Sequence, residues 1–315
     1  DERIAARVGR QNVVGGAARW LQLDGGRVDL VLTGPMALTV YGGAPVTPRF
    51  GTELGDAAGG ARLFWRHDWR SEIGASVIHV VDDGITARQD IGFDARYSPG
   101  TTFSLNTNAN ISTWEQRLAE AKVSAAWVPS EVVALRVDAR RVAPDLLISR
   151  ASVLSVFAGE PRDEAGATSS VAPLKWLEVD GHYHVILRDG EFGQRGGGGV
   201  TVFDPSARQT RVGVSGERLY LADDGYVRGR LALGRVWWNR RMTTGVDFDA
   251  FLLDVPVRDT RTSAAASAHL GWRVEQHWRM VIGGLVASST TFERRAEGTL
   301  RLVYEPDLII VGGQR

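Results

Sequence analysis

The chain has 315 residues, and its 37 basic and 37 acidic side chains give a formal net charge of zero, which excludes a bulk electrostatic attraction to nucleic acid or anionic lipid. No run of about 18 apolar residues occurs, so a membrane-spanning helix is excluded. Cysteine is absent, which excludes disulfides, thiolate metal ligands and cysteine nucleophiles.

The clearest predicted strand runs from Ile85 to Tyr97, where apolar and polar residues alternate with a period of two. At about 3.3 Å per residue this stretch spans about 43 Å, whereas strands of soluble domains usually have about five or six residues. The alternation resumes after Pro99-Gly100, from Phe103 to Ser112. The polar face carries full charges, which a soluble sandwich would not bury without partners. The pattern therefore predicts an antiparallel transmembrane β-barrel, with one strand face in lipid and the other in a wet lumen.

The same alternation returns further along the chain. It predicts strands over residues 119–127, 133–140, 177–188, 246–252, 263–273, 278–286 and 297–304. We predict 16 to 18 strands in total and favour 18. Aromatic residues end several of these strands beside short turns, as the interfacial girdles of membrane barrels do; they are Tyr97, Trp127, Trp272, Trp278 and Tyr304. We expect these short turns at every second connection, on the periplasmic side.

Three polar or glycine-rich stretches are predicted to be long loops: Gly42–Gly60, Phe157–Val171 and Asp189–Gly199, with Gly196–Gly199 as a flexible tip. No stretch marks a domain boundary, so residues 1–315 are expected to form a single barrel domain. The stretch Leu308–Gly313 reads as the start of another strand, which would leave the barrel unclosed within this chain. The chain opens without a basic and apolar leader, so we expect an exported protein to lack its signal peptide here.

Three N-terminal segments carry a specific pattern: "RVGRQ" at Arg7–Gln11, "GAARWLQLDGGRVDL" at Gly16–Leu30 and "LTVYGGAPV" at Leu38–Val46. Together they resemble the alginate-export type of outer-membrane β-barrel porin, and porins associated with exopolysaccharide secretion share these strands. The matching positions are Gly9, Arg10, Gln11, Arg19, Asp24 and Gly25. Leu23 stands where that family usually has Phe, and its G-R-Q strand usually follows several others. The resemblance thus implies either a chain that begins inside the family's barrel or a barrel that is shorter than the family's.

The parity of the strands predicts which charged side chains line the lumen. The predicted pore-lining residues are Arg88, Asp90, Asp94, Arg96, Arg136, Asp138, Arg140, Arg228, Arg230, Arg273, Arg279 and Arg301. The same face includes the acidic residues Asp180, Asp247, Asp249 and Glu297. Two roles remain open for these charges. They pair across strands and keep the lumen hydrated, or an arginine ladder draws an anionic polymer through the pore.

Enzymatic and metal-binding alternatives are weaker. Ser267 and His269 lie on one strand face, but on the predicted lumen side rather than at a lipid-facing rim. Asp180, His182 and His184 also share a face, yet their spacing of about 6.6–7 Å is awkward for one metal ion. No Gly-rich phosphate loop is followed by Lys-Ser or Lys-Thr, and no basic stripe interleaved with aromatics predicts nucleic-acid binding.

The sequence therefore predicts a non-enzymatic porin in the outer membrane of a Gram-negative bacterium, without a cofactor or metal. Its expected role is passage of a polar, anionic saccharide or exopolysaccharide. The alternative is a structural barrel that anchors a secretion, adhesion or motility complex without significant conduction. Expected partners are outer-membrane lipid and lipopolysaccharide, an anionic saccharide polymer and, as the resemblance implies, periplasmic export components.

Overall fold

The structure is a computed structural model that describes residues 3–46, 56–68, 70–82, 84–147, 161–205, 209–222, 224–238, 241–275, 277–290 and 293–304. These residues form 18 strands of one antiparallel sheet, so the predicted all-β class and the favoured strand number are confirmed. No helix among the described residues is long and apolar enough to cross a membrane.

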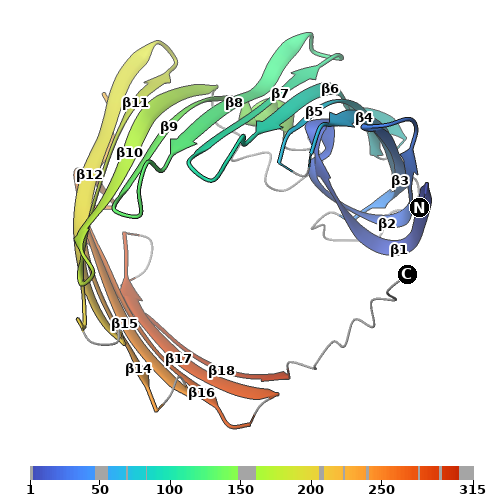
Figure 1. Cartoon of the computed structure of the whole chain (residues 1–315). Coiled ribbons are helices and arrows are strands. Elements are labelled where there is room, and N and C mark those ends of the chain that lie inside the picture. The colour runs from blue at the N-terminus through green and yellow to red at the C-terminus, as the bar shows by residue number, and fades with distance from the viewer. Residues whose placement is uncertain are drawn as a thin grey trace. The chain divides into compact units, whose positions relative to one another are not determined.

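The strands alternate in direction along the chain, and each hairpin partner follows in sequence (Figure 1). Their bounds are β1 (Ile4–Gly15), β2 (Arg19–Val31), β3 (Met36–Pro45), β4 (Ala57–Arg66), β5 (Glu72–Asp82), β6 (Ile85–Tyr97), β7 (Phe103–Ser112), β8 (Arg117–Trp127), β9 (Val133–Val142), β10 (Arg162–Leu174), β11 (Leu177–Arg188), β12 (Glu191–Phe203), β13 (Thr210–Tyr220), β14 (Gly225–Trp237), β15 (Met242–Val257), β16 (Thr260–Arg273), β17 (Trp278–Ser288) and β18 (Arg295–Tyr304). A 3₁₀ turn, η1 (Gly16–Ala18), links β1 to β2, and a single helical turn, α1 (Pro144–Leu147), follows β9.

The sheet divides into two compact units. The first comprises residues 1–130, 134–167 and 184–192, and the second comprises residues 131–133, 168–183 and 193–315. We describe each unit by itself. The expectation of a single domain stays a prediction.

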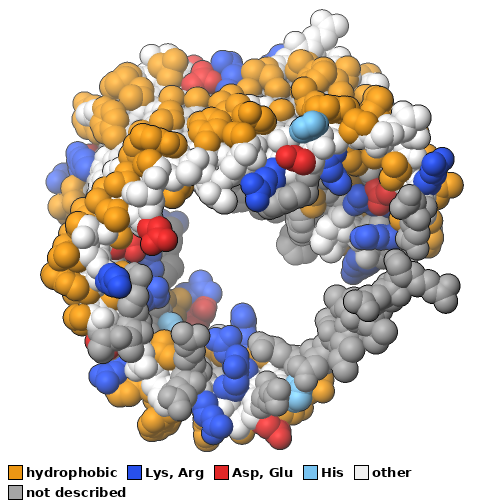
Figure 2. Space-filling view, in the orientation of Figure 1, with side chains coloured by type: hydrophobic (Ala, Val, Ile, Leu, Met, Phe, Trp, Pro, Cys, Tyr) orange, Lys and Arg blue, Asp and Glu red, His pale blue; other side chains and the backbone are white. Residues whose placement is uncertain are grey.

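In the first unit the two faces of the strands have opposite chemistry. On β6, Ile85 and Phe93 are 71% and 51% exposed, whereas the intervening Asp90 is 1% exposed. A soluble protein would show the reverse, because it buries apolar rather than charged side chains. Hydrophobic side chains accordingly gather on one side of β6–β9 and charged ones appear on the other (Figure 2).

The second unit repeats this arrangement. Val214 of β13 is opposite Leu231 of β14, and Phe248 of β15 is opposite both Leu231 and Ala266. The alternate positions carry Ser215, Arg230, Asp249 and other polar side chains. The apolar face is exposed along these strands, as a surface in contact with lipid requires.

Three loop predictions are wrong in whole or part. The stretch Asp189–Gly199 contains only a two-residue turn, because Asp189 and Gly190 both have positive φ and close a tight hairpin. Gly196–Gly199 then lie inside β12, where a Cβ on Gly197 would be 2.5 Å from the carbonyl oxygen of Gly216. Glycine there reflects close strand packing rather than a flexible tip.

The other two predicted loops overlap with strands. Within Phe157–Val171, β10 already begins at Arg162. Within Gly42–Gly60, β3 continues to Pro45 and β4 begins at Ala57. The predicted strand start at Leu308–Gly313 lies outside the described residues. Composition misled in both cases because Gly, Ala, Ser and Thr are common in loops but also suit closely packed strand faces.

A small apolar core forms where β1–β5 curve sharply (blue strands in Figure 1). It consists of Val13, Ala17, Ala18, Leu23, Tyr41, Ala58 and Ile78. Leu23 and Ala17 have no exposed surface, so this part of the otherwise polar face is filled by side chains. The core brings η1 onto the sheet.

We predict that the two faces of the first unit respond oppositely to a new charge. Ile91→Arg, at the middle of β6 on the apolar face, should lower the free energy of unfolding from lipid vesicles by about 2–4 kcal/mol. Asn108→Arg is the matched control, because Asn108 lies opposite Asp94 on the polar face. It should change that free energy by less than about 1 kcal/mol. Denaturant titration of the vesicle-embedded protein measures both, and equal destabilisation by the two changes would refute the assignment of the faces.

Candidate functional site: the polar face of the sheet

In the first unit, the register of the paired strands aligns polar residues of successive strands on one face. One row across the sheet contains Asp94 of β6, Asn108 of β7, Lys122 of β8 and Arg140 of β9. The neighbouring row brings the other predicted residues onto the same face; it contains Arg96, Asn106, Ser124 and Asp138. Arg88, Asp90 and Arg136 share this face by their even spacing from these residues. The structure thus places all seven predicted residues of this unit together, while their pore-lining role stays a prediction.

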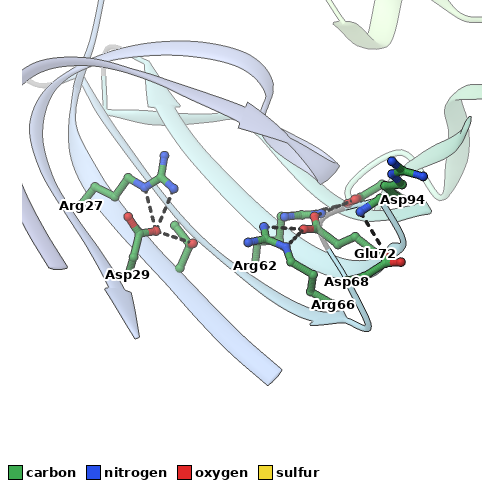
Figure 3. A network of polar contacts seen from close by, with 9 residues as sticks. Arg27, Asp29, Arg62, Arg66, Asp68, Glu72 and Asp94 are labelled. Carbon is green, nitrogen blue, oxygen red and sulfur yellow. Dashed lines mark hydrogen bonds and ion pairs between the residues drawn. The ribbon is translucent and has the colours of Figure 1, made fainter. Parts of the chain in front are cut away.

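Arg62 of β4 is the centre of a charge network on this face (Figure 3). Its guanidinium contacts the carboxylates of Asp94, with Nε 3.1 Å from Oδ1, and of Glu72. Arg66 donates to the other oxygen of Glu72 at 2.8 Å. The guanidiniums of Arg62 and Arg66 lie 4.8 and 5.1 Å from the ring centroid of Phe64. Sequence reasoning missed Arg62 and Glu72, although β4 continues the same alternation.

A third carboxylate, that of Asp68, lies near this network in the β4–β5 turn. Asp68 accepts a hydrogen bond from the backbone N–H of Arg70 at 2.9 Å (Figure 3). Desolvation raises the pKa of Asp68, but hydrogen bonds from Arg70 and Ser71 outweigh it and hold that pKa below its usual value. The turn therefore presents a negative charge at this end of the strands.

The η1 turn covers part of the polar face. The backbone N–H of Ala17 donates to Ser76 Oγ at 2.6 Å, and Arg88 Nη2 donates to the carbonyl oxygen of Ala17 at 2.6 Å. Just after the turn, Arg19 Nε lies 2.6 Å from Glu120 Oε2. Gly92 leaves the room for this contact, since a Cβ there would be 2.3 Å from the Ala17 nitrogen. Residues of β5, β6 and β8 therefore hold the β1–β2 hairpin against the sheet.

The N-terminal motif residues come together in the β1–β2 hairpin. Gly9 is opposite Gly25, and Arg10 is opposite Asp24. Arg10 donates two hydrogen bonds to the Asp24 carboxylate at 2.8 and 2.7 Å, and Gln11 Nε2 donates to the Gly25 carbonyl at 3.2 Å. The Arg10–Asp24 pair lies on the apolar face, where each side chain neutralises the charge of the other. Gln11, which is opposite the core residue Leu23, and Arg19 lie on the polar face.

In the second unit the predicted residues divide into paired and unpaired groups. Arg228 Nε donates to Asp249 Oδ1 at 2.7 Å, and Arg230 Nη2 donates to Asp247 Oδ1 at 2.6 Å. Arg273 lies directly opposite Arg279, and Arg301 is opposite Val281 on the next strand. These last three arginines have no acidic partner within the described part of the chain. Of the two roles predicted for the charges, mutual pairing therefore applies to β14 and β15, whereas attraction of anions stays a prediction for β16–β18.

The histidine and serine alternatives gain no support from geometry. His182 Nε2 lies 3.0 Å from Glu217 Oε2, and Tyr226 also donates to Glu217 at 2.7 Å. His184 Nε2 is 3.6 Å from Asp138 Oδ1. Among the described residues no group of three His, Asp or Glu side chains is placed to hold a metal ion. Within those same ranges no hydrogen bond joins Ser267 to His269.

The sequence matches no protein-family model and no curated protein. Among solved structures it is similar to Pseudomonas aeruginosa OccK11 (OpdR), with a TM-score of 0.56 and 12% identity over 96% of this chain and 93% of that one. That likeness shows the fold. The chain has the fold of an antiparallel transmembrane β-barrel. The fold-class prediction is therefore confirmed, whereas the alginate-export type of porin stays a resemblance.

Two further likenesses have lower scores. A mutant porin of Rh. blastica has a TM-score of 0.43 and 14% identity over 84% of this chain and 98% of its own. A bacterial polysaccharide outer membrane secretin has a TM-score of 0.44 and 8% identity over 79% of this chain and 90% of its own.

We predict that η1 shields Asn110, which is fully buried on the polar face of β7. The chain has no cysteine, so Asn110→Cys introduces a single thiol whose labelling by a small polar maleimide in detergent is easily followed. Adding Gly92→Val should displace η1 and speed this labelling about thirtyfold, because two hydrogen bonds worth about 1 kcal/mol each are lost.

Asn106→Cys is the matched control, since Asn106 is exposed two positions further along the same face. Its labelling should be fast with or without Gly92→Val. Fast labelling of Asn110→Cys in the otherwise unchanged chain would show that η1 does not rest on the sheet.

Proposed function

We propose that the protein is a channel in the outer membrane of a Gram-negative bacterium and conducts a polar, anionic saccharide passively. The observation that carries this proposal is the polar face, on which charged side chains of many strands follow one another opposite a continuous apolar face. Such a face supports a hydrated path, because the charges are satisfied by one another and by water rather than by a packed core. The fold of the porin type supports the same proposal.

Arginine is suited to the anionic cargo. All but two of the basic residues are arginine, and a guanidinium binds a carboxylate through two parallel hydrogen bonds that lysine cannot reproduce. Arg273, Arg279 and Arg301 add positive charge to β16–β18 without an acidic partner among the described residues. The resemblance of the N-terminal strands to polysaccharide-exporting porins supports a saccharide in particular, and it makes periplasmic export components the expected partners.

One observation favours the alternative of a structural barrel. The η1 turn and the apolar core of β1–β5 occupy part of the polar face of the first unit. A barrel that anchors an assembly needs no open path, so a filled face suits it. Conduction measurements separate the two functions directly.

We predict that the purified protein forms an open, anion-selective pore in a planar bilayer. Under a salt gradient the reversal potential should have the sign expected for anion flow, and an acidic polysaccharide should block the current from one side. Persistent silence from protein shown to be folded by its circular dichroism and its heat-dependent electrophoretic mobility would contradict the conduit and favour the anchor.

We also predict that the paired arginines of β14 are masked by their partners. The double change Asp247→Asn and Asp249→Asn should shift the reversal potential further toward anions, because it frees Arg228 and Arg230. The reverse change, Arg228→Gln with Arg230→Gln, should shift it toward cations. The shifts should shrink at about 1 M salt, where the screening length is about 3 Å. An unchanged potential in both variants would exclude this part of the face from the ion path.

A further inference from the structure

A polar groove crosses β11–β14 in the second unit. Its volume is about 330 Å³, and its lining includes Asp180, Thr201, Arg211, Ser215 and Arg230. This size is at the lower end of the range for small-molecule sites, about 300–1,000 Å³. Most ligand sites are predominantly apolar, so the polar lining points to a ligand rich in hydroxyl or charged groups.

Glycine makes the groove possible. Gly199 lies opposite Ser215, and Gly213 lies opposite both Thr201 and Ala232. A Cβ on Gly199 would be 2.9 Å from Asp180 Oδ1 and 3.0 Å from Ser215 Cβ. Because neither position carries a side chain, Asp180, Ser215 and Thr201 approach the backbone closely and line the groove.

The groove contains polar groups without partners. Asp180, Thr201, Arg211 and Ser215 have no side-chain hydrogen bond or ion pair to any other described residue. Arg230 differs, because Asp247 neutralises it at 2.6 Å. The free groups thus comprise one guanidinium, one carboxylate and two hydroxyls.

These groups are spread along the groove. Arg211 and Ser215 are four residues apart on β13, or about 13 Å. Arg211 extends over Gly234 of β14, where a Cβ would lie 2.9 Å from its Nε. Asp180 and Ser215 lie toward the other end, on either side of Gly199. A ligand that uses both ends must therefore be extended rather than compact.

We propose that this groove binds a short segment of an acidic oligosaccharide, with Arg211 holding a carboxylate and Asp180, Thr201 and Ser215 binding hydroxyl groups. A carboxylate matches the planar fork of the free guanidinium. Sugar hydroxyls donate to the Asp180 carboxylate and exchange hydrogen bonds with the hydroxyls of Thr201 and Ser215. The inference rests on the proposed function only in taking the transported saccharide as the ligand.

The test is a calorimetric titration of the folded protein in detergent at about 0.15 M salt. Trigalacturonate is the acidic probe and maltotriose is the neutral trisaccharide of similar length. Trigalacturonate should bind and maltotriose should bind at least about tenfold more weakly. Arg211→Gln should weaken trigalacturonate binding about tenfold or more, because a hydrogen bond to a charged group is lost.

Two further variants make the result specific. Ala232→Leu fills the groove without changing charge and should weaken both sugars. Arg261→Gln removes an exposed arginine of β16 that does not line the groove, and it should leave trigalacturonate affinity within about twofold. Equal weakening by Arg261→Gln and Arg211→Gln would mean general electrostatic attraction and overturn the site. Equal affinity for the two sugars would overturn recognition of the carboxylate.

The proposed binding groove and the proposed conduction are refuted by different outcomes of these experiments. Binding of trigalacturonate that Arg211→Gln abolishes, together with an electrically silent bilayer, would support the groove and reject conduction. An open anion-selective pore whose protein binds neither sugar would reject the groove and leave the conduit standing.

Discussion

The period-two alternation of side chains is the constraint on which the rest of the structure depends. Along the paired strands the backbone N–H and C=O groups are satisfied by neighbouring strands, so the side chains are free to place apolar groups on one face and charges on the other. Ile91 and Asp90 are adjacent in sequence yet lie on opposite faces of β6. A one-residue slip in register would exchange those faces, so strand pairing and function cannot vary independently.

On the polar face some arginines are paired with carboxylates and hold the structure together, whereas others have no such partner. In the first unit, Arg62 and Arg88 each bind carboxylates, and Arg88 also holds the η1 turn through a carbonyl oxygen. In the second unit, Arg228 and Arg230 are paired, while Arg211 and Arg279 have no acidic partner among the residues that the structure describes. Surface ion pairs contribute little stability, typically about 0–1 kcal/mol. Pairing mainly orders the arginines, and the unpaired ones remain available to a ligand.

The sequence predicted what depends on local alternation and missed what depends on distant contacts. The strand from Ile85 to Tyr97 and the face that its charges occupy were readable because period two is a local signal. The docking of Ala17 on Ser76 joins residues 59 apart, and no local pattern marks it. Gly196–Gly199 were misread as a loop because glycine lacks the alternating signal, although their place in β12 follows from close packing against β13.

The same limit explains why the charged residues were easier to find than the groove. Arg228 and Arg230 stand out by charge and parity, but pairing with Asp249 and Asp247 reduces what they offer to a ligand. The groove depends on Gly199 and Gly213, which contribute by having no side chain. Their effect depends on which residues of the neighbouring strands lie opposite them. A passing polymer needs contacts strong enough to enter and weak enough to leave. A few free groups spread over about 13 Å meet that requirement better than a dense cluster of charges, since each contact is made and broken singly.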